Sequence, residues 1–204
     1  MAAVASVSET DHAGLDAFAA GWNDNELTVA DLLPQRGRIG STRLGETGLR
    51  PAATAVLVSL ALRPVLEPYL ASVRDHLVDR TWHLGICPWC GAPPGFSDVV
   101  EDGRRRLACQ FCGGHWMFSR TRCPFCGTDA TGDQVRLELG EKDEGYVVTG
   151  CRACSSYLKE LDRRTRWNGG PALLEDWGSP HFDLVARRQG YVRPAMSLLE
   201  LREP

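Results

Sequence analysis

The sequence has 204 residues, a formal net charge of −3 and a hydrophobic fraction of 43%, which is typical of a soluble globular protein of one or two domains. The apolar content excludes an intrinsically disordered chain. The longest strongly apolar stretch, Pro51–Leu62, has 12 residues, whereas a bilayer-spanning helix needs about 20. The first residues lack the basic and apolar segments of a secretory signal. We therefore expect a cytoplasmic protein with no membrane segment.

Residues 1–80 contain no cysteine and predict a helical N-terminal domain. Three prolines punctuate its second half, so we expect two helices, at 52–62 and 65–79, with a break between them. Shorter patterns predict a helix near 10–21 and another near 28–33. Apolar side chains follow one helix face, which we expect to pack in the core, at Leu66, Tyr69, Leu70, Val73 and Leu77.

All eight cysteines fall in four C-x2-C pairs, and none is left over. In a reducing cytoplasm clustered cysteines hold metal more often than they form disulfides. A disulfide scaffold would usually be smaller, richer in cysteine and secreted. We therefore predict metal ligation by Cys87, Cys90, Cys109, Cys112, Cys123, Cys126, Cys151 and Cys154.

The spacing of the pairs predicts two metal ribbons, at 81–120 and 121–162. Eighteen residues separate the inner cysteines of the first set of four and 24 those of the second, close to the range of structural zinc sites. Sequential pairing is favoured, although only ten residues separate Cys112 from Cys123, which leaves an interleaved pairing open. Three of the pairs are followed by glycine and the fourth by Ser155, where we expect the backbone N–H to turn toward sulfur.

Between the cysteines the pattern predicts short antiparallel strands. Asp102-Gly103 is a hairpin signal between two such segments. The expected strands are 97–100, 104–109, 115–119, 135–139, 146–149 and 157–161. Residues 163–204 form a tail with one helix, since Ser179 suits its N-cap, Pro180 its first turn and Gly190 its C-terminal end. The fold class is therefore α+β, with a helical N-terminal region, two tandem rubredoxin-like or zinc-ribbon modules and a C-terminal helix.

Four thiolates around one ion suit zinc and also rubredoxin-type iron. Such a site has no open position for water or substrate, so its role is structural, or electron transfer if iron is bound. No catalytic motif stands out, and we expect a protein that is not an enzyme. We call each C-x2-C pair with its turn a knuckle. His83 and His115 flank the knuckles, but eight cysteines suffice for two ions, so we interpret both histidines as ordinary polar residues.

Zinc ribbons often bind nucleic acid, and the sequence has two basic runs, Arg104–Arg106 and Arg163–Arg166. The aromatic residues Trp89, Phe111, Trp116 and Phe125 lie among the knuckles, where a small core is the more common role. Eight thiolates with two divalent ions add four negative charges, which takes the net charge from −3 to about −7. That charge disfavours a large phosphate-binding footprint. The basic runs remain candidate surfaces for a protein partner.

The order of the motifs resembles the formate dehydrogenase accessory protein family, FdhE, over roughly residues 65–200. The resemblance rests on the order of the segments and not on any single C-x2-C pair. The N-terminal region is shorter and more divergent than the family pattern. The segments are ICPWCGAPP at 86–94, LACQFC at 107–112 with Trp116, RCPFCG at 122–127, CRAC at 151–154 with Tyr157-Leu158-Lys159, Phe182-Asp183-Leu184, and Gly190-Tyr191-Val192-Arg193-Pro194 with Leu198-Leu199.

This resemblance implies a cytoplasmic assembly factor that binds the catalytic subunit of formate dehydrogenase during its maturation. It also implies that the eight cysteines hold two metal ions, either iron or zinc, in two sites of four cysteines each. Two alternative functions are a rubredoxin-like electron carrier and a zinc-ribbon nucleic-acid-binding protein. We expect no nucleic acid and no membrane as partners.

Overall fold

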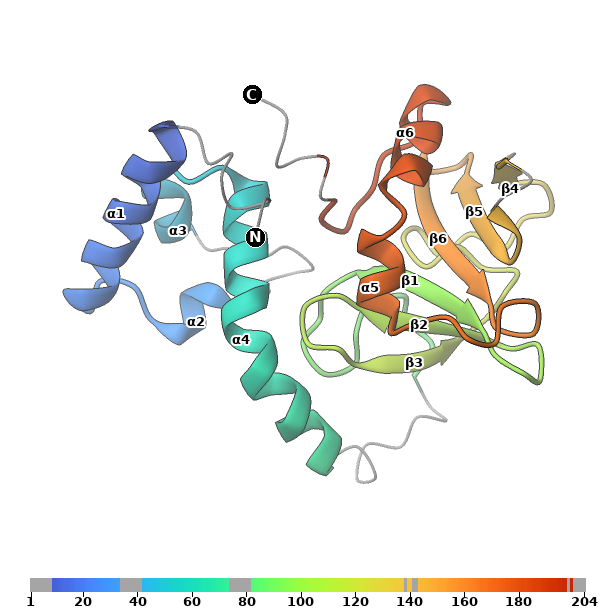
Figure 1. The fold of residues 1–204 in the computed structure, drawn as a ribbon, viewed down its shortest axis with the longest axis horizontal. Coiled ribbons are helices and arrows are strands. Elements are labelled where there is room, and N and C mark those ends of the chain that lie inside the picture. The colour runs from blue at the N-terminus through green and yellow to red at the C-terminus, as the bar shows by residue number, and fades with distance from the viewer. Residues whose placement is uncertain are drawn as a thin grey trace.

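The structure is a computed structural model that describes residues 9–33, 42–73, 82–137, 139–140, 143–197 and 199. Helices occupy both ends of the chain and six strands lie between them (Figure 1). The helices are α1 (Glu9–Asn23), α2 (Val29–Leu32), α3 (Thr42–Glu46), α4 (Pro51–Val73), α5 (Ala172–Trp177) and α6 (Pro180–Arg188). The strands are β1 (Pro94–Val99), β2 (Arg105–Cys109), β3 (His115–Phe118), β4 (Gln134–Leu137), β5 (Tyr146–Cys151) and β6 (Ser156–Asp162).

The strands of both cysteine modules form one sheet with the order β3-β2-β1-β6-β5-β4. Within each module the neighbouring strands are antiparallel. The two modules join where β1 runs parallel to β6, with Ser97 opposite Glu160 and Val99 opposite Asp162. The junction joins β1, the first strand of the first module, to β6, the third strand of the second module. Because these two strands are parallel, the second module has the same orientation in the sheet as the first. The predicted α+β class with two tandem ribbons is confirmed, and the joint sheet is the feature that the sequence analysis did not foresee.

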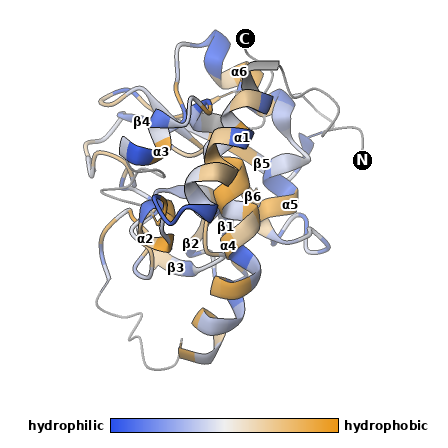
Figure 2. Ribbon diagram, turned by 90° about the vertical axis from the view of Figure 1, so that its left-hand side faces the viewer, coloured by the Kyte–Doolittle hydropathy of each residue, from blue (hydrophilic) through white to orange (hydrophobic). Residues whose placement is uncertain are grey.

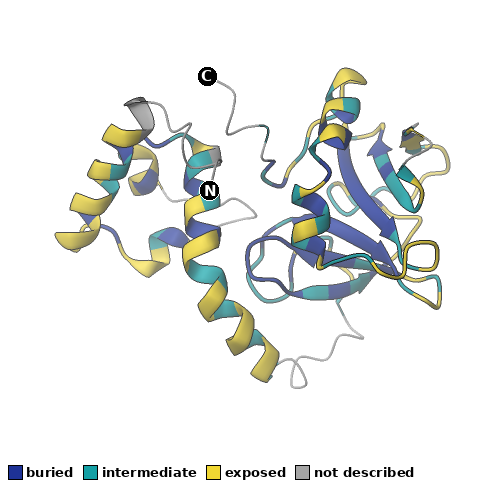
Figure 3. Cartoon of the chain, in the orientation of Figure 1, coloured by how far each residue is buried: buried dark blue, intermediate teal, exposed yellow. Residues whose placement is uncertain are grey.

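The sheet has two covered faces because successive side chains of a strand point to opposite sides. On one face Phe96, Ala108 and Leu161 pack with Ala172 of α5. On the other face Leu107 and Leu158 pack into a larger core that includes the first cysteine module and apolar side chains of the N-terminal helices. Figure 3 shows the central strands as buried, in contrast to the mostly exposed helix α1. The sheet is therefore covered on both faces, and its two halves carry the two cysteine clusters.

Helix α4 runs without interruption from Pro51 to Val73, so the predicted break between two helices is wrong. Pro64 and Pro68 lie inside it and leave the carbonyls four residues earlier without their usual amide partners. One of these carbonyls belongs to Leu60 and the other to Pro64, and both residues are exposed, so water can replace the lost bonds. The helix is held from the other side, where Val58, Leu62, Leu66 and Leu70 pack against the core.

The predicted apolar face of this helix is only partly buried. Leu66 and Leu70 contact the core as expected, but Tyr69 is exposed and Leu77 lies outside the described residues. Because α4 continues through the prolines, its segment Ala53–Val73 is long enough to span a bilayer. Its mean hydropathy of 1.4 also suits such a helix, although length and composition are the only grounds for this comparison. Figure 2 shows hydrophobic residues along its length. The sequence analysis expected no membrane segment because it considered only the 12 residues Pro51–Leu62, whereas the helix continues to Val73.

The remaining helices agree in part with the predicted pattern. Helices α1 and α2 occur where they were expected, whereas α3 and α5 were not predicted. Helix α6 begins after Ser179 and contains Pro180, and Gly190 after its end has a φ of +84°. The hydroxyl of Ser179 does not cap α6, because it donates backwards to the carbonyl oxygen of Glu175 at 2.6 Å. The boundaries of the four proposed domains stay predictions.

Candidate metal centres

The eight cysteine side chains gather into two clusters of four. In each cluster the four Sγ atoms lie within 4.8 Å of one another. The first cluster contains Cys87, Cys90, Cys109 and Cys112, and the second contains Cys123, Cys126, Cys151 and Cys154. The sulfur atoms therefore group in sequential pairs, as predicted, and not in the interleaved arrangement. The reason is local, because each module brings its two knuckles together across its own hairpin. Ligation of metal by these sulfur atoms stays a prediction.

The sulfur positions match the geometry of a tetrahedral site. With metal–sulfur bonds of about 2.3 Å, the sulfurs of a tetrahedron lie about 3.8 Å apart. The Sγ atoms of Cys123 and Cys154 are 3.8 Å apart, and those of Cys87 and Cys112 are 3.5 Å apart. A disulfide would need about 2.05 Å, and all eight cysteines are unbridged. Each cluster therefore fits one ion of the zinc or ferrous type, held by four sulfurs.

Each knuckle is closed by a repeated backbone turn. The N–H of Gly91 donates to the carbonyl oxygen of Cys87 at 2.9 Å, and Gly127 donates in the same way to Cys123 at 3.0 Å. These glycines have φ values of +74° and +79°, a conformation that glycine adopts without steric cost. Ser155 adopts a φ of +54° at the fourth knuckle. The residue after each pair thus allows the turn to close. The prediction that its N–H points to sulfur is wrong for Gly91 and Gly127, whose N–H groups donate to carbonyl oxygens.

Other backbone groups approach the sulfurs. Burial raises the pKa of the Cys123 thiol, while hydrogen bonds from the backbone of Cys126 and Phe125 act in the opposite direction. Burial also raises the pKa of Cys109 in the first cluster. Four thiolates in such a small volume need a cation for charge balance, so the donor set and its surroundings favour a bound divalent ion.

The two clusters differ in how far they are covered. Phe111 and Trp116 are buried in the core around the first cluster, and Trp89 and Phe125 pack against it. This confirms the prediction that these four aromatic residues form a core. In the second cluster Cys126 is exposed and Cys154 is partly exposed. The second cluster is therefore the one that solvent reaches more readily.

The first cluster is also attached to the N-terminal helices. Arg63 of α4 donates a hydrogen bond to the carbonyl oxygen of Gln110, inside the second knuckle of this cluster, at 3.0 Å. A cavity of about 700 Å³ opens beside this contact. Its lining includes Arg63, Cys109, Trp167 and Pro171, so it lies between α4, the first cluster and the segment that precedes α5. A ligand in this cavity would lie next to the first cluster.

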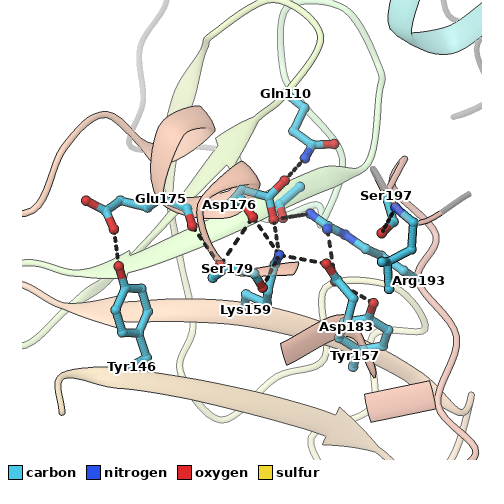
Figure 4. A network of polar contacts seen from close by, with 12 residues as sticks. Gln110, Tyr146, Tyr157, Lys159, Glu175, Asp176, Ser179, Asp183, Arg193 and Ser197 are labelled. Atoms are coloured by element: carbon cyan, nitrogen blue, oxygen red, sulfur yellow. Dashed lines mark hydrogen bonds and ion pairs between the residues drawn. The ribbon is translucent and has the colours of Figure 1, made fainter. Parts of the chain in front are cut away.

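A buried ion cluster on the opposite face of the sheet was not predicted (Figure 4). It consists of Lys159 of β6, Asp176 of α5, Asp183 of α6 and Arg193. Lys159 Nζ lies 2.8 Å from Asp176 Oδ1, and Arg193 Nη2 lies 2.6 Å from the same oxygen. All four side chains are at most 2% exposed. Burial lowers the pKa of Lys159, while Asp176 and Asp183 act in the opposite direction.

This ion cluster joins segments that lie far apart in the sequence. The hydroxyl of Tyr157 donates to Asp183 at 2.6 Å, and the amide of Gln110 donates to Asp176. Gln110 belongs to the first module, so the cluster also connects both modules to the C-terminal helices. Lys159, Asp183 and Arg193 all lie in segments on which the family resemblance rests, and this was the one sequence signal for the ion cluster. The spacing of these residues in the sequence does not predict that they contact one another.

The two basic runs are largely neutralised within the chain. Asp98, which is fully buried, pairs with Arg106 at 2.7 Å and with Arg163 at 2.8 Å. Arg164 pairs with Asp162 at 2.6 Å, and Arg166 lies over the ring of Tyr146 at 5.1 Å. Their charge is therefore less available to a partner than the sequence alone indicated, and the aromatic residues near the knuckles are not exposed as stacking platforms.

Comparison with known proteins gives a consistent result. No family model matches the chain. A "Protein FdhE homolog" from Stutzerimonas stutzeri is 30% identical over 208 residues, which cover 92% of this chain and 64% of the relative. The crystal structure of the FdhE protein from Pseudomonas aeruginosa superposes with a TM-score of 0.63 at 26% identity, over 76% of this chain and 54% of that one. In sequence and in fold the chain is similar to the FdhE family.

A further FdhE homolog, from Aquifex aeolicus, is 30% identical over 137 residues, which cover 65% of this chain and 47% of that protein. The chain thus spans between about half and two thirds of the length of these relatives. The similarity to FdhE includes the fold, as the superposition shows. What the FdhE family does as a whole is therefore carried to this shorter chain as a proposal.

Proposed function

We propose that this protein is an accessory factor for formate dehydrogenase that acts in the cytoplasm, binds the catalytic subunit and is not itself an enzyme. Similarity to the FdhE family in sequence and fold supports the link to formate dehydrogenase. The observation that carries the proposal is the pair of four-sulfur clusters built into one sheet. Four protein ligands would complete each tetrahedron, so the ions would act as structural supports without an open coordination position.

The metal ions would be held by the eight cysteines, four to each ion. They would stiffen two small modules whose own cores are limited. The cavity beside Cys109 would bring a docked segment of the catalytic subunit next to the first cluster and α4. This chain's own residues would bind and position that segment, and they would transfer no group to it.

A gene deletion in the native organism tests this proposal. Formate dehydrogenase activity is expected to disappear while the catalytic subunit polypeptide is still made, and the intact gene is expected to restore activity. A gene encoding Cys87→Ser and Cys109→Ser should restore little activity, whereas Arg136→Ala, an exposed change on β4, should restore it fully. Normal activity in the deletion strain would refute the accessory role.

Electron transfer is the second candidate, because Cys126 places a sulfur ligand at the surface of the second cluster. This function needs iron that cycles between two oxidation states. Purification without oxygen, followed by metal analysis, tests it. Bound iron with a reversible optical change supports electron transfer, and zinc as the only metal excludes it. The ion pairs of the basic runs disfavour the third alternative, a nucleic-acid-binding ribbon.

A further inference from the structure

A second hollow, of about 840 Å³, lies beside the start of β2 and the end of β3. We call it the arginine hollow, because its lining includes Arg104, Arg105, Arg120 and Arg122. Among the described residues of this lining, Asp102 is the one carboxylate. The cavity beside Cys109 differs, since its lining contains three arginines and four carboxylates. Arg104 pairs with Asp102 at 2.6 Å and Arg105 pairs with Glu160 at 2.8 Å, so the excess positive charge of the arginine hollow comes from Arg120 and Arg122.

Two of its arginines are positioned by the backbone. Arg120 donates from Nη1 to the carbonyl oxygen of Gly103 at 3.1 Å, and Arg122 donates from Nε to Gly127 at 2.9 Å. Within the part of the chain that the structure describes, neither forms an ion pair with a carboxylate. Each guanidinium has five N–H donors, so most of its donors remain for a ligand. A positioned guanidinium loses less conformational freedom when it binds a carboxylate.

Arg105 provides independent support. Its side chain is 5% exposed, and its Nε donates to Glu160 at 2.8 Å. Its Nη1 is buried and has no hydrogen-bond partner among the described residues. A buried donor without an acceptor is unfavourable, so native structures seldom leave one. A carboxylate oxygen that enters the hollow and displaces the covering side chains would supply the missing acceptor.

The lining also has an apolar part, formed by Trp82, Met117 and Phe118. Guanidinium groups beside apolar side chains suit a ligand that presents both carboxylates and aliphatic groups. A peptide segment rich in Glu and Leu has this combination. A long polyanion such as nucleic acid is disfavoured, because the chain carries a net charge of −3 and each metal-loaded site of four thiolates adds negative charge.

We infer that the arginine hollow is a binding site for a short acidic segment of a protein partner. Side-chain carboxylates of the segment would pair with the guanidiniums of Arg120 and Arg122, and its aliphatic side chains would contact Trp82 and Phe118. The site lies apart from the cavity beside Cys109. It stands whether or not the partner is formate dehydrogenase.

The test uses the full metal-loaded chain and a short fluorescein-labelled peptide of alternating Glu and Leu, with binding measured by fluorescence anisotropy at low salt. Arg120→Ala is expected to weaken binding about tenfold, the usual loss for one charge-assisted hydrogen bond. Arg120→Lys keeps the charge but lacks the planar guanidinium group, so its affinity should lie between those of the unmodified chain and Arg120→Ala. Arg136→Ala removes the same charge from β4, at the opposite edge of the sheet, and should change affinity by less than about twofold.

Three results would overturn the inference. A peptide of alternating Gln and Leu binding as tightly as the acidic one would remove the role of the carboxylates. Equal losses for Arg120→Ala and Arg136→Ala would show a general charge effect and no site. Displacement of the peptide by a short single-stranded oligonucleotide or by pyrophosphate more effectively than by unlabelled peptide would assign the hollow to phosphates instead. Unchanged metal content in every variant controls for folding.

Discussion

Lys159 of β6 and Asp183 of α6 form an ion pair in which Nζ lies 2.9 Å from Oδ2, with both side chains at most 2% exposed. The pair belongs to the buried ion cluster and attaches the C-terminal helices to the sheet. Charges removed from water so completely are favourable only when every partner is present. The attachment of α5 and α6 therefore depends on an intact set of two cations and two carboxylates.

Asp183→Ala is expected to lower the free energy of unfolding by about 3–5 kcal/mol, because it leaves two buried cations with one carboxylate. Urea unfolding of the metal-loaded protein measures this loss. Arg164→Ala removes the exposed partner of Asp162 and serves as the control, for which little change is expected. Equal stability of the two variants would contradict a structural role for the cluster.

Alkaline pH should destabilise the protein through Tyr146. Burial raises its pKa to about 12, and its hydrogen bond to Glu175 acts in the same direction. In the unfolded chain a tyrosine loses its proton near pH 10, so between about pH 10 and 12 the folded state binds more protons than the unfolded state. Stability that is fully present below pH 10 is therefore lost as the pH rises to 12. Unfolding measured across this range should show a smaller decline for Tyr146→Phe, and an identical decline would refute the assignment.

Chelator treatment should remove metal in two phases. The second cluster should release its ion first, since Cys126 is exposed, whereas Cys87, Cys109 and Cys112 are buried. Metal release monitored with a coloured chelator measures both phases. Cys126→Ser should remove or accelerate the fast phase and leave the slow phase unchanged. Loss of the fast phase in Cys109→Ser instead would reverse the assignment.

Gly85 lies in close contact with the second module. A Cβ atom built on it would lie 1.7 Å from the carbonyl oxygen of Pro124, which is backbone of the first knuckle of the second cluster. Gly85→Ala is expected to cost at least about 1–3 kcal/mol, because one of the two backbones must move. Gly45→Ala, in α3 with open space around it, should be neutral or slightly stabilising. Thermal unfolding of both variants decides the matter, and equal melting temperatures would show that the modules do not depend on this contact.

Local features of the sequence predicted the cysteine modules well. A C-x2-C pair and its following glycine define a knuckle within five residues, and the Asp102-Gly103 hairpin brings Cys90 and Cys109 together. The same local reasoning failed at Pro64, because packing of the opposite side of α4 compensates for the missing hydrogen bond. Proline indicates where a helix is weakened, and tertiary contacts decide whether it ends there.

The ion pairs between residues far apart in the sequence could not be predicted. Positions 159, 183 and 193 acquire their roles only when β6, α6 and the following segment are folded together. Similarly, the run Arg104–Arg106 alternates across a strand, so Arg105 points toward Glu160 while Arg106 points toward Asp98 on the other face. The sequence shows the charges of such a run, but their partners lie on neighbouring strands.

The accessory role is tested most directly by recovering the tagged chain from the native cytoplasm while formate dehydrogenase is expressed, with bound proteins identified by mass. We predict recovery of the catalytic subunit with the unmodified chain and with Arg136→Ala. We predict loss of that subunit when Cys87 and Cys90 are both changed to Ser. Absence of the catalytic subunit from every sample would contradict the accessory role.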